Sequence, residues 1–84
     1  MEIIRGHIYR AKRPKPAGGI FAPVFNDRVV VYINPLSERV QYDSPTVRRG
    51  WKYPTTSRVQ FETWAGSDVT EGYPDEGWAA WPTP

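Results

Sequence analysis

Residues 28–43 read Arg-Val-Val-Val-Tyr-Ile-Asn-Pro-Leu-Ser-Glu-Arg-Val-Gln-Tyr-Asp, and this stretch decides the fold. Its first six residues form an almost continuous apolar, β-branched run, which is typical of a central strand covered on both faces. Asn34 followed by Pro35 matches the start of a type I turn. Residues 38–43 therefore predict a strand that returns antiparallel. The buried positions expected from this pattern are Val29, Val31, Ile33 and Val40.

Two more strands are expected before this hairpin. Residues 3–11 predict a first strand with Ile4 and Ile8 on one face. Residues 12–19 contain two prolines and two glycines, which exclude a regular element. Residues 20–25 predict a second strand, and Asn26-Asp27 suits a tight hairpin turn into the central strand.

A short helix is expected near residue 60. Ser57 and Gln60 match a capping box, which predicts a helix over residues 58–65, and Gly66 would end it as a C-terminal cap. Phe61 and Trp64 would share the buried face, with at least one of them in the core. The same segment also alternates in a way that suits a strand, but the residues at its two ends favour the helix.

The fold class expected from this order is mostly β with one short helix: a small antiparallel SH3-like barrel or meander of about four to five strands. Residues 1–66 would form the domain, and residues 67–84 an extended acidic tail packed on it. A chain of 84 residues buries only ~60–65% of its unfolded surface. Without cysteine, its core must come from the 12 aromatic and the β-branched residues.

Charge divides the chain into two unlike parts. All 11 Lys and Arg residues lie in residues 1–58, where four carboxylates reduce the sum to +7. Residues 59–84 hold five carboxylates and no cation, which gives −5. This asymmetry predicts a basic binding surface, an acidic tail, or both.

Catalytic and metal-binding patterns are absent from the sequence. His7 is the single histidine, and there is no zinc-ligand spacing, Walker motif or glycine-rich dinucleotide turn. No apolar run is long enough for a transmembrane helix. We therefore expect a non-enzymatic cytoplasmic binding module that has no cofactor, no metal and no membrane contact.

Two segments combine cations with features that suit nucleic acid. The loop after the first strand places four cations in six residues, and a later irregular segment alternates cations with flat aromatic rings, as single-strand binding requires. The first segment could instead be a solvated loop, and in the second Trp51 and Tyr53 could close the end of the barrel while the cations point outward. The predicted nucleic-acid-binding residues are Arg10, Lys12, Arg13, Lys15, Arg48, Arg49, Trp51, Lys52 and Tyr53.

The C-terminal segment supports a different class of function. Its exposed tryptophans would be costly in water, so they pack on the domain or anchor a partner protein. An acidic tail on the basic half would also compete with phosphates. The alternative function is thus a protein-binding inhibitor or modulator, encoded by a phage or mobile element, that acts on a protein or ribonucleoprotein. Its contact residues would be Tyr73, Asp75, Glu76, Trp78 and Trp81.

Overall fold

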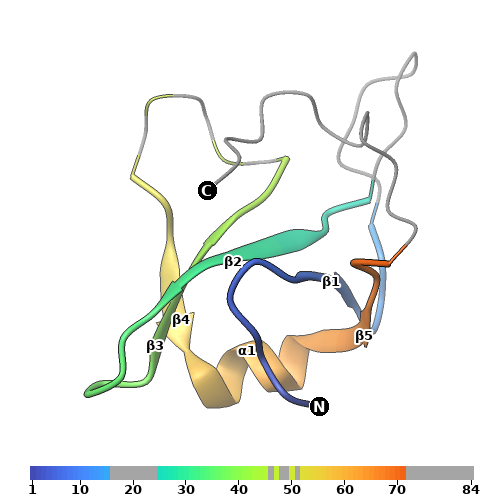
Figure 1. Cartoon of the computed structure of the whole chain (residues 1–84). Helices are drawn as coiled ribbons and strands as arrows, with labels where there is room; N and C mark the ends of the chain where they lie inside the picture. The colour runs from blue at the N-terminus through green and yellow to red at the C-terminus, as the bar shows by residue number, and fades with distance from the viewer. Residues whose placement is uncertain (16–24, 46, 48–49, 51, 72–84) are drawn as a thin grey trace.

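The expected central strand lies at the centre of a five-stranded antiparallel sheet, with strand order β4-β3-β2-β1-β5 (Figure 1). The computed structural model describes residues 1–15, 25–45, 47, 50 and 52–71. Within them the chain forms β1 (Ile8–Ala11), β2 (Arg28–Ile33), β3 (Arg39–Asp43), β4 (Thr55–Ser57), α1 (Arg58–Trp64) and β5 (Ala65–Asp68). The mostly-β class with one short helix is confirmed.

The turn between β2 and β3 forms where the Asn-Pro pair predicted it. The Asn34 side-chain Oδ1 accepts hydrogen bonds from the backbone N–H of Leu36 (2.9 Å) and of Ser37 (3.1 Å). The Glu38 N–H then donates to the Asn34 carbonyl at 2.9 Å. Glu38 has a φ of 57°, so the loop closes in the left-handed region without a glycine.

A β-bulge changes which residues of β2 are buried. Val30 pairs with Tyr42, but the next pair joins Tyr32 to Gln41, so Val31 has no residue opposite it. The extra residue breaks the alternation. Val29 and Val30 are both buried, whereas Val31 and Ile33 are only half-buried. The prediction that Val31 is a core residue is therefore wrong.

The first strand is shorter than expected because Gly6, at φ 85°, turns the chain just before it. Ile3 is buried and Ile4 is exposed, so residues 3–11 do not alternate as one strand. Tyr9 is fully buried, although alternation along residues 3–11 would place it on the face opposite Ile4 and Ile8. Its hydroxyl accepts from the Ile4 N–H at 2.7 Å and donates to the Glu2 carbonyl at 3.0 Å, so it ties the N-terminal segment to the core.

The expected hairpin at Asn26-Asp27 is wrong. Residues 20–24 lie outside the described residues, but both edges of β2 are occupied by β1 and β3. A strand joined to β2 by a tight turn would need one of those edges. The Asn26 N–H instead donates to the Lys15 carbonyl at 2.8 Å, which holds this segment beside the end of the basic loop.

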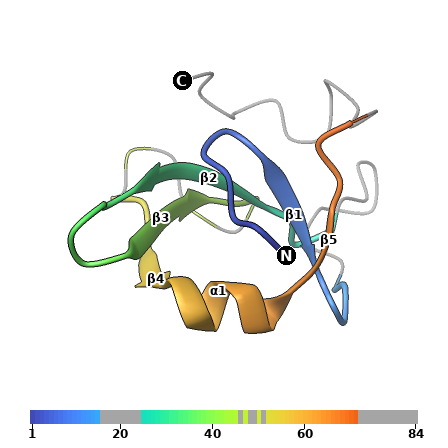
Figure 2. The same ribbon diagram turned by 60° about the horizontal axis from the view of Figure 1, so that its bottom comes forward.

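The helix α1 begins as predicted and ends differently. The Ser57 hydroxyl accepts from the Gln60 N–H at 3.1 Å, while the Gln60 side chain accepts from Thr56 rather than from the cap residue. The chain passes directly from α1 into β5, which the sequence did not predict. Figure 2 shows that α1 runs across one face of the sheet, from one edge strand to the other.

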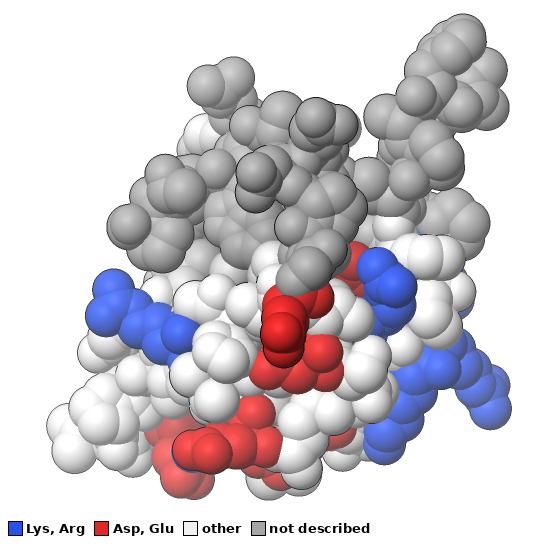
Figure 3. Space-filling view, turned by 45° about the vertical axis from the view of Figure 1, so that its right-hand side comes forward, with Lys and Arg blue, Asp and Glu red and all other residues white. Residues whose placement is uncertain are grey.

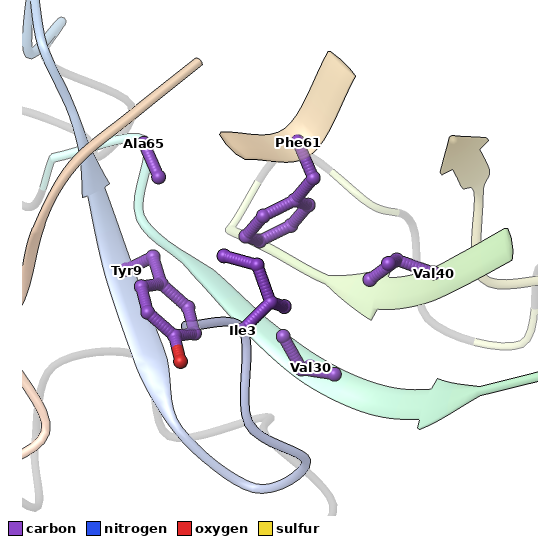
Figure 4. Packing of buried hydrophobic residues seen from close by; sticks show 6 residues of the cluster. All are labelled: Ile3, Tyr9, Val30, Val40, Phe61 and Ala65. Atoms are coloured by element: carbon purple, nitrogen blue, oxygen red, sulfur yellow. The ribbon is translucent and has the colours of Figure 1, made fainter. Parts of the chain in front are cut away.

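The core lies between the sheet and α1. Figure 4 shows Ile3 pointing into the space between Tyr9, Val30 and Phe61, with Val40 and Ala65 completing the cluster. Phe61 meets the Tyr9 ring edge-on, with centroids 5.6 Å apart, as aromatic quadrupoles prefer. The prediction that Phe61 or Trp64 is buried is confirmed by Phe61. In the described part of the chain, no helix has the length and apolar character needed to span a membrane.

Candidate nucleic-acid interface

A basic cleft of about 410 Å³ lies where the segment after β1 faces the end of α1. Two backbone hydrogen bonds hold its walls: the Lys12 N–H donates to the Trp64 carbonyl (3.0 Å), and the Asn26 N–H donates to the Lys15 carbonyl (2.8 Å). Three of the predicted cations therefore belong to one concave surface, which we call the basic cleft. Its lining residues are Ala11, Lys12, Arg13, Lys15, Asn26, Thr63 and Trp64.

The electrostatic character of the basic cleft follows from its lining. Lys12, Arg13 and Lys15 are exposed, and no carboxylate is among the described residues that line it. In the view of Figure 3, basic side chains lie at both sides of the molecule, and acidic ones lie toward its middle and lower part. A concave surface with a single sign of charge concentrates anions near it.

Trp64 is a lining residue that the sequence analysis assigned only to the helix. It packs partly against the core, with its ring centroid 5.3 Å from that of Phe61, and it also lines the basic cleft. A half-buried ring beside cations is the arrangement on which a base can stack. The i, i+3 spacing of Phe61 and Trp64 placed both rings on one side of α1, but only the packing of β1 against α1 shows that Trp64 also reaches the cleft.

Arg10 is engaged in an ion pair. Its Nε lies 3.0 Å from Oδ1 of Asp27, and its Nη2 lies 3.1 Å from Oδ2, so the contact is bidentate. Asp27 is fully buried, and the Arg10 guanidinium also covers the Phe25 ring at 4.5 Å. Asp27 neutralises the charge of Arg10, and this ion pair joins β1 to the segment before β2. Arg10 is not among the described residues that line the basic cleft.

The second predicted segment is only partly described. Arg48, Arg49 and Trp51 lie outside the described residues, as do all five residues of the predicted C-terminal contact surface, residues 73–81. Lys52 is exposed and Tyr53 is half-buried, and neither lines the basic cleft. The segment that contains Lys52 and Tyr53 follows Asp43, and Asp43 pairs with Val29 near the start of β2. The chain therefore leaves β3 at the end of the sheet where the basic cleft lies.

A separate polar cluster joins β5 to the start of β1. His7 Nδ1 lies 2.7 Å from Asp68 Oδ2, while the N–H and hydroxyl of Thr70 both donate to Oδ1. Burial raises the pKa of Asp68, but the hydrogen bonds from His7 and Thr70 outweigh it and leave that pKa below its ordinary value. This cluster fastens an edge strand. Among the described residues, no group of three or more possible metal ligands comes together.

Comparisons with protein-family models, curated proteins and solved structures give no match for this chain. The function is therefore inferred from the geometry and charge of the basic cleft.

Proposed function

We propose that the protein is a small non-enzymatic module that binds single-stranded nucleic acid through the basic cleft. One observation carries the proposal: three exposed cations and Trp64 line the same concave surface, and no described carboxylate does. The cations would follow the phosphates while a base stacks on the indole. Such a ring favours a single strand, whose unstacked bases can reach it.

The fold that presents this cleft would be a small SH3-like barrel. The strand order places β4 and β5 at opposite edges of the sheet, yet α1 joins them with no intervening loop residue. A connection of one short helix requires the sheet to curl so that its edges approach each other. Curling would also bring the ends of β1 and α1 together around the basic cleft.

Salt-dependent binding tests the proposed function. Replacing Lys12 and Arg13 with Gln should weaken binding of a labelled oligothymidylate and flatten its salt dependence. Each lost phosphate contact lowers the slope of log affinity against log salt by about 0.7 for a single strand. Arg39→Gln is the matched control for each single replacement, Lys12→Gln and Arg13→Gln, because each variant removes one charge and Arg39 is an exposed cation at the other end of the sheet, in β3. Equal losses in the single variants and the control, or no binding by the wild type at low salt, would refute the proposal.

The alternative function, binding to a protein partner, is favoured by a different surface. Leu36 is 93% exposed and Val59 is 71% exposed, and a backbone hydrogen bond from Arg58 to Glu38 joins their segments. Two exposed aliphatic side chains on neighbouring segments suit a protein contact. Affinity capture from lysate with and without nuclease separates the two functions. A partner that survives nuclease and is lost in the Leu36→Ser, Val59→Ser double variant would support this alternative.

A further inference from the structure

Arg28 at the start of β2 places its guanidinium among three aromatic rings. Its Cζ lies 4.1 Å from the ring centroid of Trp64, 4.3 Å from that of Tyr42 and 5.8 Å from that of Phe61. Cations over ring faces are attracted by the ring quadrupole, more strongly where water is excluded. The three rings therefore fix the guanidinium in one place and restrict its rotation.

Among the residues that the structure describes, none is a counter-ion for the guanidinium of Arg28. In the described part of the chain, Arg10 pairs with Asp27 and Arg58 with Glu62, but no carboxylate pairs with Arg28. Burial lowers the pKa of Arg28, because it disfavours the charged guanidinium. A half-buried cation that packs on rings has lost part of its hydration, and no described carboxylate compensates this loss. A bound anion would supply a partner.

Arg28 also lies beside the basic cleft. Trp64, the ring nearest to its Cζ, lines the cleft, and so does Asn26, two residues before it. In the sheet, Arg28 pairs with Tyr9 of β1, the strand whose last residue, Ala11, is another lining residue. The aromatic box and the cleft thus share one wall.

We propose that Arg28, which lies beside the basic cleft without being one of its described lining residues, binds a phosphate group of the nucleic acid that the cleft holds. This inference rests on the proposed function. A planar guanidinium offers a phosphate two parallel N–H donors, and one that stacking holds in place loses less entropy on binding. Lys12, Arg13 and Lys15 stand on exposed loop positions and would add charge, whereas Arg28 would set the position of one phosphate.

The Arg28→Lys variant tests this role because it keeps the charge and removes the planar fork. In fluorescence anisotropy with a labelled oligothymidylate, we expect affinity to fall roughly ten-fold or more. The slope against salt should stay close to that of the wild type, because the number of cations is unchanged. Lys12→Gln should instead lower the slope, and Arg39→Lys should change neither quantity.

A second measurement needs no substitution and so avoids the risk that Arg28→Lys destabilises the aromatic box. The Nε–Hε resonance of Arg28 in the wild-type protein should shift as oligothymidylate is added. The affinity calculated from this shift should equal the affinity measured by anisotropy. If the wild type binds while this resonance stays still and Arg28→Lys binds equally well, the inference fails and the proposed function stands. If the wild type does not bind, the proposed function fails and this inference fails with it.

Discussion

Replacing Gly66 with Ala tests how closely β5 approaches β1. A Cβ at this position would lie 2.8 Å from Lys12 Cα, 3.0 Å from Lys12 N and 3.1 Å from the Ala11 carbonyl oxygen. All three are backbone atoms, so no side-chain rotation can relieve the contact. The shortest distance is about 0.6 Å below the 3.4 Å at which ordinary contact begins. Gly66 does not have a positive φ, so the position demands glycine for space.

The magnitude follows from two opposing effects. Forcing an extra methyl into a packed position costs about 1–3 kcal/mol, and a shift of β5 would also strain the hydrogen bond from the Lys12 N–H to the Trp64 carbonyl. Removing glycine from the unfolded chain returns only about 0.4–1 kcal/mol. The expected net loss is about 1.3 kcal/mol, which corresponds to a fall in Tm of roughly 5–10 °C for a domain of this size.

Thermal melts followed by circular dichroism measure this loss, and two further variants sharpen it. Ser67→Ala, at an exposed position of the same strand, should stay within about 0.5 kcal/mol of the wild type. Gly66→Asn distinguishes two reasons for a glycine at this position. Asn is tolerated at a left-handed C-terminal cap, so a capping role would accept it, but Asn is larger than Ala, so a lack of space would not. An unchanged Tm for Gly66→Ala, or a stable Gly66→Asn, would refute the close approach.

Three other changes have defined outcomes. Phe61→Ala should cost about 3–5 kcal/mol in urea unfolding because it empties the centre of the core, and the exposed Val59→Ala is its control. Ser57→Ala should cost about 1 kcal/mol in the same assay because the Gln60 N–H loses its acceptor. Burial raises the pKa of Asp43, and the hydrogen bond from the Ser44 N–H offsets only part of this rise. Ionisation of Asp43 therefore opposes folding. Asp43→Asn should therefore gain stability over the wild type as pH rises above about 3.8, and unfolding at a series of pH values that shows no such gain would contradict this.

The sequence alone determined the elements whose signals are local. The apolar run in residues 28–33 predicted a central strand, and β2 does lie between β3 and β1, although only Val29 and Val30 are buried. The Asn34 turn and the Ser57 cap were equally readable, because each uses a side chain that bonds to the backbone within three residues. For the site, composition identified Lys12, Arg13 and Lys15 as exposed cations of one loop.

Tertiary structure alone decided the features that depend on distant pairing. Residues 65–68, Ala-Gly-Ser-Asp, have little intrinsic preference for a strand and become β5 because β1 offers them a free edge. The bulge at Val31 arises from the register between β2 and β3, which the residues of β2 alone do not encode. Arg10 and Arg28 have the same side chain, yet one meets a buried carboxylate and the other three rings. Their different roles follow from the folded positions of their neighbours, because a local pattern contains no information about which residues the fold brings together.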